Sequence, residues 1–226
     1  MSTGSFPTLA SAWISAHAAD QVLLALLPLL LTVSGADATT VSLVVAAHSA
    51  AWLIVSLPVG AYADALPRRQ IMRAGAIAII AGATTGAGAM AMGRASAAVL
   101  GLVSFLVAAG VVMIVLSAFA LLPRFIARPD LARSNAVLEF GRALTCVIAP
   151  LVVAYLVARG ASVVAFGLAL LGGIAALLAT AQLPAEPPAT SAALPMMQAI
   201  REGAAFVARE PLLRAIALCA IAWNSA

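Results

Sequence analysis

The hydrophobic residues of this 226-residue chain are gathered into long, nearly uninterrupted apolar stretches. A helix rises 1.5 Å per residue, so about 20 apolar residues cross the hydrocarbon core of a bilayer. The stretches are continuously apolar rather than alternating, which favours helices over a barrel. Those that reach the required length lie at about residues 9–33, 41–63, 74–92, 97–122, 136–158 and 163–183. The pattern therefore predicts an all-α membrane protein with six transmembrane helices.

The overall composition agrees with lipid as the solvent. Hydrophobic residues make up 64% of the chain and charged residues 9%, whereas a soluble domain carries roughly 25% charged residues. So much apolar surface cannot be hidden inside a water-soluble globule. The net charge of +4 therefore does not point to nucleic acid. We expect the lipid bilayer, and no nucleic acid, among the partners.

The basic residues, all of them arginine, indicate how the helices are oriented. Half of them lie in the short loops after the second and fourth stretches: Arg68, Arg69, Arg73, Arg124, Arg128 and Arg133. Short loops rich in arginine stay on the cytoplasmic side. We therefore predict that both ends of the six-helix unit face the cytoplasm. The expected location is the plasma (inner) membrane of a bacterium, which the chain crosses several times.

The composition changes after residue 183. Several prolines there predict a linker that is not regular throughout. Residues 196–209 place apolar side chains at helical spacing among charges, which predicts a short amphipathic helix on the cytoplasmic face. An apolar run of about 15 residues follows, shorter than a normal span. We expect a truncated chain with three parts: a six-helix half (1–183), a cytoplasmic linker (184–211) and the start of a seventh transmembrane helix (212–226).

A short polar loop joins the second and third stretches. Gly60 and Asp64 lie one helical turn apart, and Arg68 and Arg69 follow before the next helix. This spacing resembles the signature loop of the major facilitator superfamily of secondary transporters. The resemblance implies a conformational role for all four residues, with Asp64 facing the N-terminus of a helix in a C-terminal six-helix half. The alternative is interfacial charge at a helix end.

The fifth stretch carries a second motif. Small residues recur at Gly141, Thr145 and Ala149, followed by Pro150 and Ala154. Such a stripe predicts close helix packing and a kink. It resembles the antiporter motif of facilitator exporters, although alanine replaces glycine at positions 149 and 154. The resemblance implies the N-terminal half of an exporter, with the missing C-terminal half as a partner.

Three further segments, at residues 13–28, 122–136 and 202–214, resemble the superfamily's exporter branch that includes enterobactin and macrolide exporters. The likeness covers nearly the whole chain. It implies efflux of a small-molecule substrate.

Polar side chains inside the apolar stretches are the candidates for chemistry. Asp20 lies midway along the first stretch, and a carboxylate at that depth is costly and marks function by default. His17 lies three residues earlier, on the same helix face. We hypothesise that Asp20 is the protonatable group that couples substrate movement to the proton gradient. The alternative is a structural hydrogen bond to a neighbouring helix.

Three more polar residues complete the candidate set for proton coupling or a substrate cavity. His48, in the second stretch, either lines the cavity or makes a hydrogen bond between helices. Glu139 and Arg142 are spaced i and i+3, so they can pair. They form either an interfacial ion pair or a cationic site at the cavity edge that faces an anionic substrate.

The sequence contains no nucleotide-binding loop, zinc-ligand cluster or nucleophile elbow, so we expect no cofactor, no metal and no catalytic residue. The energy for transport then comes from a gradient or from a partner, not from ATP bound to this chain. We predict a secondary active transporter, a proton-coupled antiporter that exports a small amphipathic molecule, siderophore-like or drug-like. The alternatives are an importer of the same superfamily and an inactive truncated membrane protein. A membrane enzyme is disfavoured because the few polar groups are spread over different helices.

Overall fold

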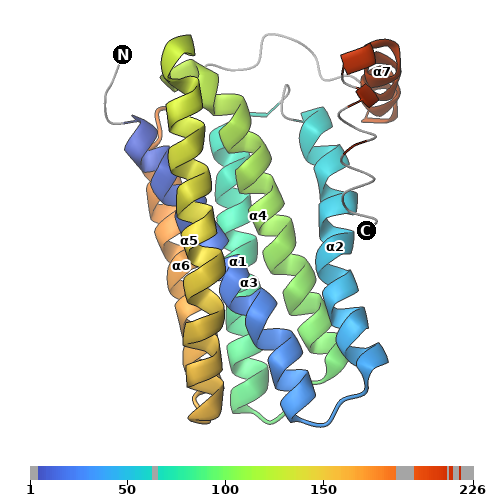
Figure 1. Cartoon of the computed structure of the whole chain (residues 1–226), viewed down its shortest axis with the longest axis vertical. Helices are drawn as coiled ribbons and strands as arrows, with labels where there is room; N and C mark the ends of the chain where they lie inside the picture. Colours follow the sequence, from blue (N-terminus) through green and yellow to red (C-terminus); the bar gives the residue numbers. More distant parts are fainter. Residues whose placement is uncertain (1–4, 63–65, 187–195, 213, 216–218, 220–226) are drawn as a thin grey trace.

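The computed structural model describes residues 5–62, 66–186, 196–212, 214, 215 and 219. The described residues form an all-α bundle of long antiparallel helices (Figure 1) and contain no strand. The elements in chain order are α1 (Ser5–Val33), α2 (Ala38–Tyr62), α3 (Arg68–Ala91), α4 (Ala97–Phe125), η1 (Arg128–Asp130), α5 (Leu131–Ala158), α6 (Ser162–Gln182) and α7 (Met196–Arg209). The predicted fold class is confirmed.

The first six α-helices are each long and apolar enough to cross a membrane, with spans of 21 to 31 residues. At 1.5 Å per residue, even the shortest reaches about 30 Å. Each one covers an apolar stretch found in the sequence, but several begin earlier than predicted. Helix α3 begins at Arg68 rather than residue 74, and α5 at Leu131 rather than residue 136. Their first turns are polar, so hydropathy alone does not show where the backbone becomes helical.

At one end of the bundle, glycines follow the C-termini of three helices and an aspartate caps the N-terminus of another. Gly35, Gly93 and Gly160 follow the ends of α1, α3 and α5 with φ angles of 80°, 65° and 69°, which favour glycine. Asp37 caps α2 by accepting a hydrogen bond from the Thr40 backbone N–H at 3.3 Å and another from the Thr40 hydroxyl. These hydrogen bonds, chiefly the one from the hydroxyl, lower the pKa of Asp37. The turns at this end are therefore short and defined.

Helices α1 and α4 form the centre of the bundle. Half of the membrane-spanning window of α1 and 61% of that of α4 are buried, against 11% for α2 and 17% for α5. Helix α1 packs against α4, α5 and α6, whereas α2 packs mainly against α4. Figure 1 shows α2 and α5 on opposite sides of the central pair. Helix α2 therefore lies beside α4 and helix α5 beside α1, and both keep large apolar faces exposed.

Glycines allow two of the helices to touch through their backbones. A Cβ atom built on Gly75 of α3 would lie 2.5 Å from the carbonyl oxygen of Gly110 in α4. A Cβ atom built on Gly110 would in turn meet the carbonyl oxygen of Gly75. Gly86 of α3 similarly faces the ring of Phe166 in α6. Small residues bring backbones together in lipid, where no hydrophobic force drives helices together.

The segment after α6 is only partly described. Helix α7 covers the residues for which the apolar spacing predicts an amphipathic helix, and it lies near α2 (Figure 1). Residues 187–195 of the predicted linker, and most of the apolar run at 212–226, lie outside the described residues. The division of the chain into three parts stays a prediction.

We expect Gly110→Ala to destabilise the protein by about 1–3 kcal/mol, because the added methyl group meets a backbone carbonyl that cannot move aside. The measurement is thermal unfolding of the purified protein in detergent. The matched control is Gly101→Ala in the same helix, where a Cβ atom meets nothing within 4 Å. Equal melting temperatures for the two variants would contradict the close α3–α4 crossing.

Candidate functional site

A cavity of about 410 Å³ lies between α1, α2, α4 and α5. Its wall contains every residue that the sequence marked for proton coupling or substrate binding. The lining residues are Trp13, His17, Asp20, Gln21, Leu24, His48, Trp52, Val115, Phe119, Glu139 and Arg142. These polar groups come from separate helices, as the sequence indicates, and helix packing brings them to one cavity. Their individual roles stay predictions.

One face of α1 supplies the central strip of the cavity wall. Trp13, His17, Gln21 and Leu24 follow one another at steps of three or four residues, with Asp20 beside them. Such spacing places side chains on one helix face. Sequence reasoning missed Trp13 and Gln21 as cavity residues. The signal was present, because both lie four residues from His17.

Asp20 is the most deeply placed carboxyl group of the cavity, with 4% of its surface exposed. Gln21 Nε2 donates a hydrogen bond to Asp20 Oδ2 at 3.4 Å. On the facing helix α2, His48 Nδ1 lies 3.8 Å from Asp20 Oδ1. That separation suits an ion pair when the histidine is protonated, but it is too long for a hydrogen bond. Asp20 therefore faces a titratable partner on another helix.

Several buried polar atoms of the α1 strip have no hydrogen-bond partner among the described residues. They are Trp13 Nε1, both ring nitrogens of His17 and Asp20 Oδ1. Leaving a buried donor or acceptor unpaired costs about 1–3 kcal/mol, and native proteins contain few such groups. All of these atoms belong to residues that line the cavity. Their concentration there marks the cavity as a place where polar groups of a bound molecule would be stabilised.

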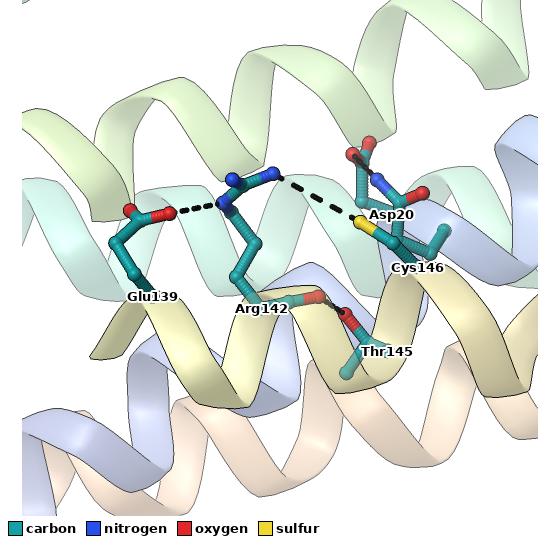
Figure 2. A network of polar contacts seen from close by, with 6 residues as sticks. Asp20, Glu139, Arg142, Thr145 and Cys146 are labelled. Carbon is teal, nitrogen blue, oxygen red and sulfur yellow. Dashed lines mark hydrogen bonds and ion pairs between the residues drawn. The ribbon is translucent and has the colours of Figure 1, made fainter. Parts of the chain in front are cut away.

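The opposite wall carries an ion pair on α5. Arg142 Nε donates to Glu139 Oε2 at 2.7 Å, and Arg142 Nη1 lies 3.9 Å from Cys146 Sγ. Thr145 Oγ1 donates to the Arg142 carbonyl at 2.7 Å, so it completes a local network on this helix (Figure 2). The two opposite charges largely neutralise each other. The interpretation of Glu139 and Arg142 as a paired set fits this geometry better than a free cationic site.

A second cavity of about 590 Å³ continues along α1 toward the other end of the helix. Its lining residues are Gln21, Leu24, Ala25, Pro28, Leu29, Thr32, Pro150, Val153 and Ala154. No charged residue is among them. Gln21 and Leu24 line both cavities. The two spaces are therefore neighbouring parts of one cleft, polar at one end and apolar at the other.

The helix-five motif is divided between packing and this cleft. Gly141 packs against α1, since a Cβ atom there would lie 2.6 Å from Ile14 Cδ1, and Ala149 is also buried. Pro150 and Ala154 instead line the apolar cavity. Helix α5 runs without interruption through Pro150. Only part of the stripe therefore serves helix packing.

The signature loop is anchored through Arg69. Its guanidinium donates from Nε to the Thr180 carbonyl at 3.3 Å and from Nη2 to the Ala181 carbonyl at 2.5 Å. These are carbonyl groups of the last turn of α6, where a cation is favoured. Asp64 lies outside the described residues, and a Cβ atom on Gly60 would meet no described atom within 4 Å. The arginine end of the motif is thus tied to the bundle.

Glu186, which sequence reasoning missed, holds three helix ends together. Its Oε2 accepts a hydrogen bond from the Arg69 backbone N–H at 3.1 Å. Its Oε1 lies 3.5 Å from Arg68 Nη1 and 3.1 Å from Arg124 Nη1. The start of α3, the end of α4 and the segment after α6 therefore meet at one carboxylate. The signal was that Glu186 is the sole acidic residue between α6 and α7.

A bundle of membrane-length helices around a cleft with a polar and an apolar end is the architecture of a multi-pass membrane protein with a site for a small molecule. The comparison with protein families shows which kind of membrane protein this is. The sequence matches the Major Facilitator Superfamily over residues 9–226, and the chain belongs to this family. The family consists of secondary transporters rather than enzymes, and its members work in the bilayer on small-molecule substrates. A search of the curated proteins found no match to the chain.

We expect Glu186→Gln to lower the stability of the protein by about 1–3 kcal/mol, because hydrogen bonds and ion pairs to a charged group are lost at a site that is nearly buried. Thermal unfolding of the purified protein measures the effect. Glu202→Gln on α7 is the control, since Glu202 is exposed and, among the described residues, accepts a side-chain hydrogen bond only from Gln198 of the same helix. Melting temperatures that fall equally in both variants would rule out a special role for Glu186.

Proposed function

We propose that this chain forms one half of a proton-coupled exporter that moves a small amphipathic molecule out across the bacterial plasma membrane. The cleft along α1 is the substrate path, and Asp20 is the proton-coupling group. The observation that carries the proposal is the position of Asp20. It lies midway along a spanning helix, is buried in the cavity wall and has His48 Nδ1 at 3.8 Å.

The surroundings of Asp20 are suited to a change of protonation. The polar groups that share its cavity are His17 and Gln21 on α1, His48 on α2, and Glu139 and Arg142 on α5. Helix α4 contributes only Val115 and Phe119 to this wall. An ionised Asp20 attracts a protonated His48, whereas a neutral Asp20 does not. Because α1 and α2 have few other contacts, the protonation state alters a main link between them.

Protonation of Asp20 also provides a link between proton binding and helix movement. A ligand shifts a conformational equilibrium only by its different affinity for the two states. A proton on Asp20 weakens the attraction to His48, so it favours a state in which α1 and α2 are farther apart. Substrate and proton then act on the same cleft from different sides of the membrane, as alternating access requires.

The signature loop supplies the second part of the proposed mechanism. Glu186 and Arg69 tie the ends of α3, α4 and α6 to one another, so this side of the half moves as a unit. We infer that Gly60, Asp64, Arg68 and Arg69 contact the partner six-helix half in one of the two transport states. Among the described residues, no atom lies within 4 Å of a Cβ atom built on Gly60. This supports the inference because these residues leave room for a helix of the partner.

We expect Asp20→Asn in the full-length protein to abolish proton-driven efflux, because the amide keeps the side-chain shape but cannot exchange a proton. Efflux of the neutral dye Nile red and the cationic dye ethidium from energised cells, with and without a protonophore, provides the measurement. Asp37→Asn is the matched control, since asparagine also caps a helix and Asp37 lies outside the cavity. Protonophore-sensitive efflux at the wild-type rate in the Asp20 variant would remove this residue from the mechanism.

A further inference from the structure

Acidic and basic groups are not equal in number at the polar end of the cleft. Glu139 and Arg142 pair at 2.7 Å and cancel. His17 and His48 also line the cavity. While both histidines are neutral, Asp20 is the remaining charged group, so an ionised Asp20 leaves the cavity with an excess negative charge. A charge that enters a site of low dielectric must be compensated there. A cationic ligand finds that compensation in Asp20. An anionic ligand meets repulsion from Asp20 and must separate Arg142 from Glu139.

Two aromatic rings at the same end have surface free for such a cation. Phe119 of α4 is 48% exposed and Trp52 of α2 is 36% exposed, and both line the polar cavity. A cation over an aromatic face gains about 0.5–2 kcal/mol, more as it is desolvated. Trp13 is buried and packs edge-on against Phe119, with ring centroids 4.9 Å apart. The polar end therefore combines an acidic group with aromatic surface from two other helices.

The unpaired buried atoms indicate which polar groups a ligand would carry at the end that binds near Asp20, here called its head group. Asp20 Oδ1 and one ring nitrogen of neutral His17 are acceptors without a described hydrogen-bond donor, whereas Trp13 Nε1 and the other ring nitrogen of His17 are donors without a described acceptor. A protonated amine with N–H groups satisfies the acceptors. An oxygen atom close to the amine accepts a hydrogen bond from a donor. A quaternary ammonium or a purely hydrophobic molecule leaves these atoms unpaired.

The apolar cavity accommodates the rest of the molecule. It meets the polar cavity at Gln21 and Leu24 and contains no charged lining residue. Leu29 of α1 and Val153 of α5 offer apolar walls beyond this junction. Each methylene transferred from water to such surroundings contributes about 0.8 kcal/mol. An alkyl or aryl tail attached to the head group can therefore lie along α1 and α5.

We propose that the substrate is a cationic amphiphile, with a protonated amine and a neighbouring oxygen bound at Trp13, His17 and Asp20 and an apolar tail bound between α1 and α5. This assignment rests on the proposed function, because it treats the cleft as the transport site. It goes further by fixing the sign of the charge and the orientation of the molecule in the cleft.

The test is equilibrium binding to the purified full-length protein in lipid nanodiscs, measured by isothermal titration calorimetry. The probes are N-octylethanolamine, the neutral N-octanoylethanolamine, octanoate and the short-tailed N-butylethanolamine. We expect N-octylethanolamine to bind roughly tenfold or more tightly than each of the other three probes, because each lacks a charge of the right sign or part of the tail.

Two variants separate the head site from the tail site. Asp20→Asn should lower the affinity for N-octylethanolamine by roughly tenfold or more, whereas Asp37→Asn should bind this probe as tightly as the wild type does. Ala154→Phe narrows the apolar cavity from an exposed position on α5, so it should reduce the preference for octyl over butyl and leave the preference for amine over carboxylate unchanged. If Asp20→Asn does not fold, the Ala154→Phe variant still tests the site of the tail, and the probe series on the wild type still tests the sign of the ligand charge.

The outcomes also separate this inference from the proposed function. No proton gradient is present in the binding experiment, so a failure of proton-driven efflux leaves its result intact. Octanoate or the neutral amide binding as tightly as the amine would overturn the cationic assignment, even where efflux is proton-driven. Equal affinities for the octyl and butyl amines would overturn the orientation, and no binding by any probe would overturn both.

Discussion

A carboxyl group within hydrocarbon has few stable arrangements, because lipid tails neither solvate a charge nor accept a hydrogen bond. Asp20 meets this constraint by lying on the cavity side of α1, beside Gln21 and opposite His48. The central position of α1 makes that placement possible, since α4, α5 and α6 cover its other sides. The shape of the cleft and its distribution of charge follow from the need to keep this one group away from lipid.

A second carboxylate, Glu186 at the end of the bundle, has a different role from Asp20. Glu186 lies where arginines of two loops and the end of α6 come together, and its carboxylate is fully engaged. Asp20 has one weak hydrogen bond and one distant histidine. The first carboxylate fixes the relative positions of helix ends. The second is the group that, in the mechanism we propose, responds to protons or to a bound cation. This contrast between a satisfied and an unsatisfied acidic group is the main division of roles in the chain.

Much of the fold could be predicted from the sequence, because membrane length and continuous apolar character are local properties. The candidate cavity residues could also be named, since a polar side chain in an apolar stretch is conspicuous. That Arg68 and Arg124 lie at the same end of the bundle was implied by arginine counting, and both contact the same Glu186 oxygen. The family match agrees with the resemblance carried by the signature loop.

Other features could not be predicted, because they depend on how helices cross. Phe119 and Val115 are ordinary apolar residues until α4 packs beside α1. Glu186 stands out as the sole acidic residue between α6 and α7, but its neighbours in the sequence do not indicate which arginines it meets. The pairing of Gly75 with Gly110 requires knowledge of the register between α3 and α4. A single sequence names the unusual residues but not the ordinary ones that surround them.

The contact between Gly75 and Gly110 also limits how the half can deform. Two backbones that touch without intervening side chains have no rotamers with which to absorb a change in spacing. Helices α3 and α4 therefore move together as one rigid unit. Changes of shape within the half are left to α2 and α5, which are the least buried of the spanning helices. Their exposed apolar surfaces can slide against lipid or another helix at little cost in free energy.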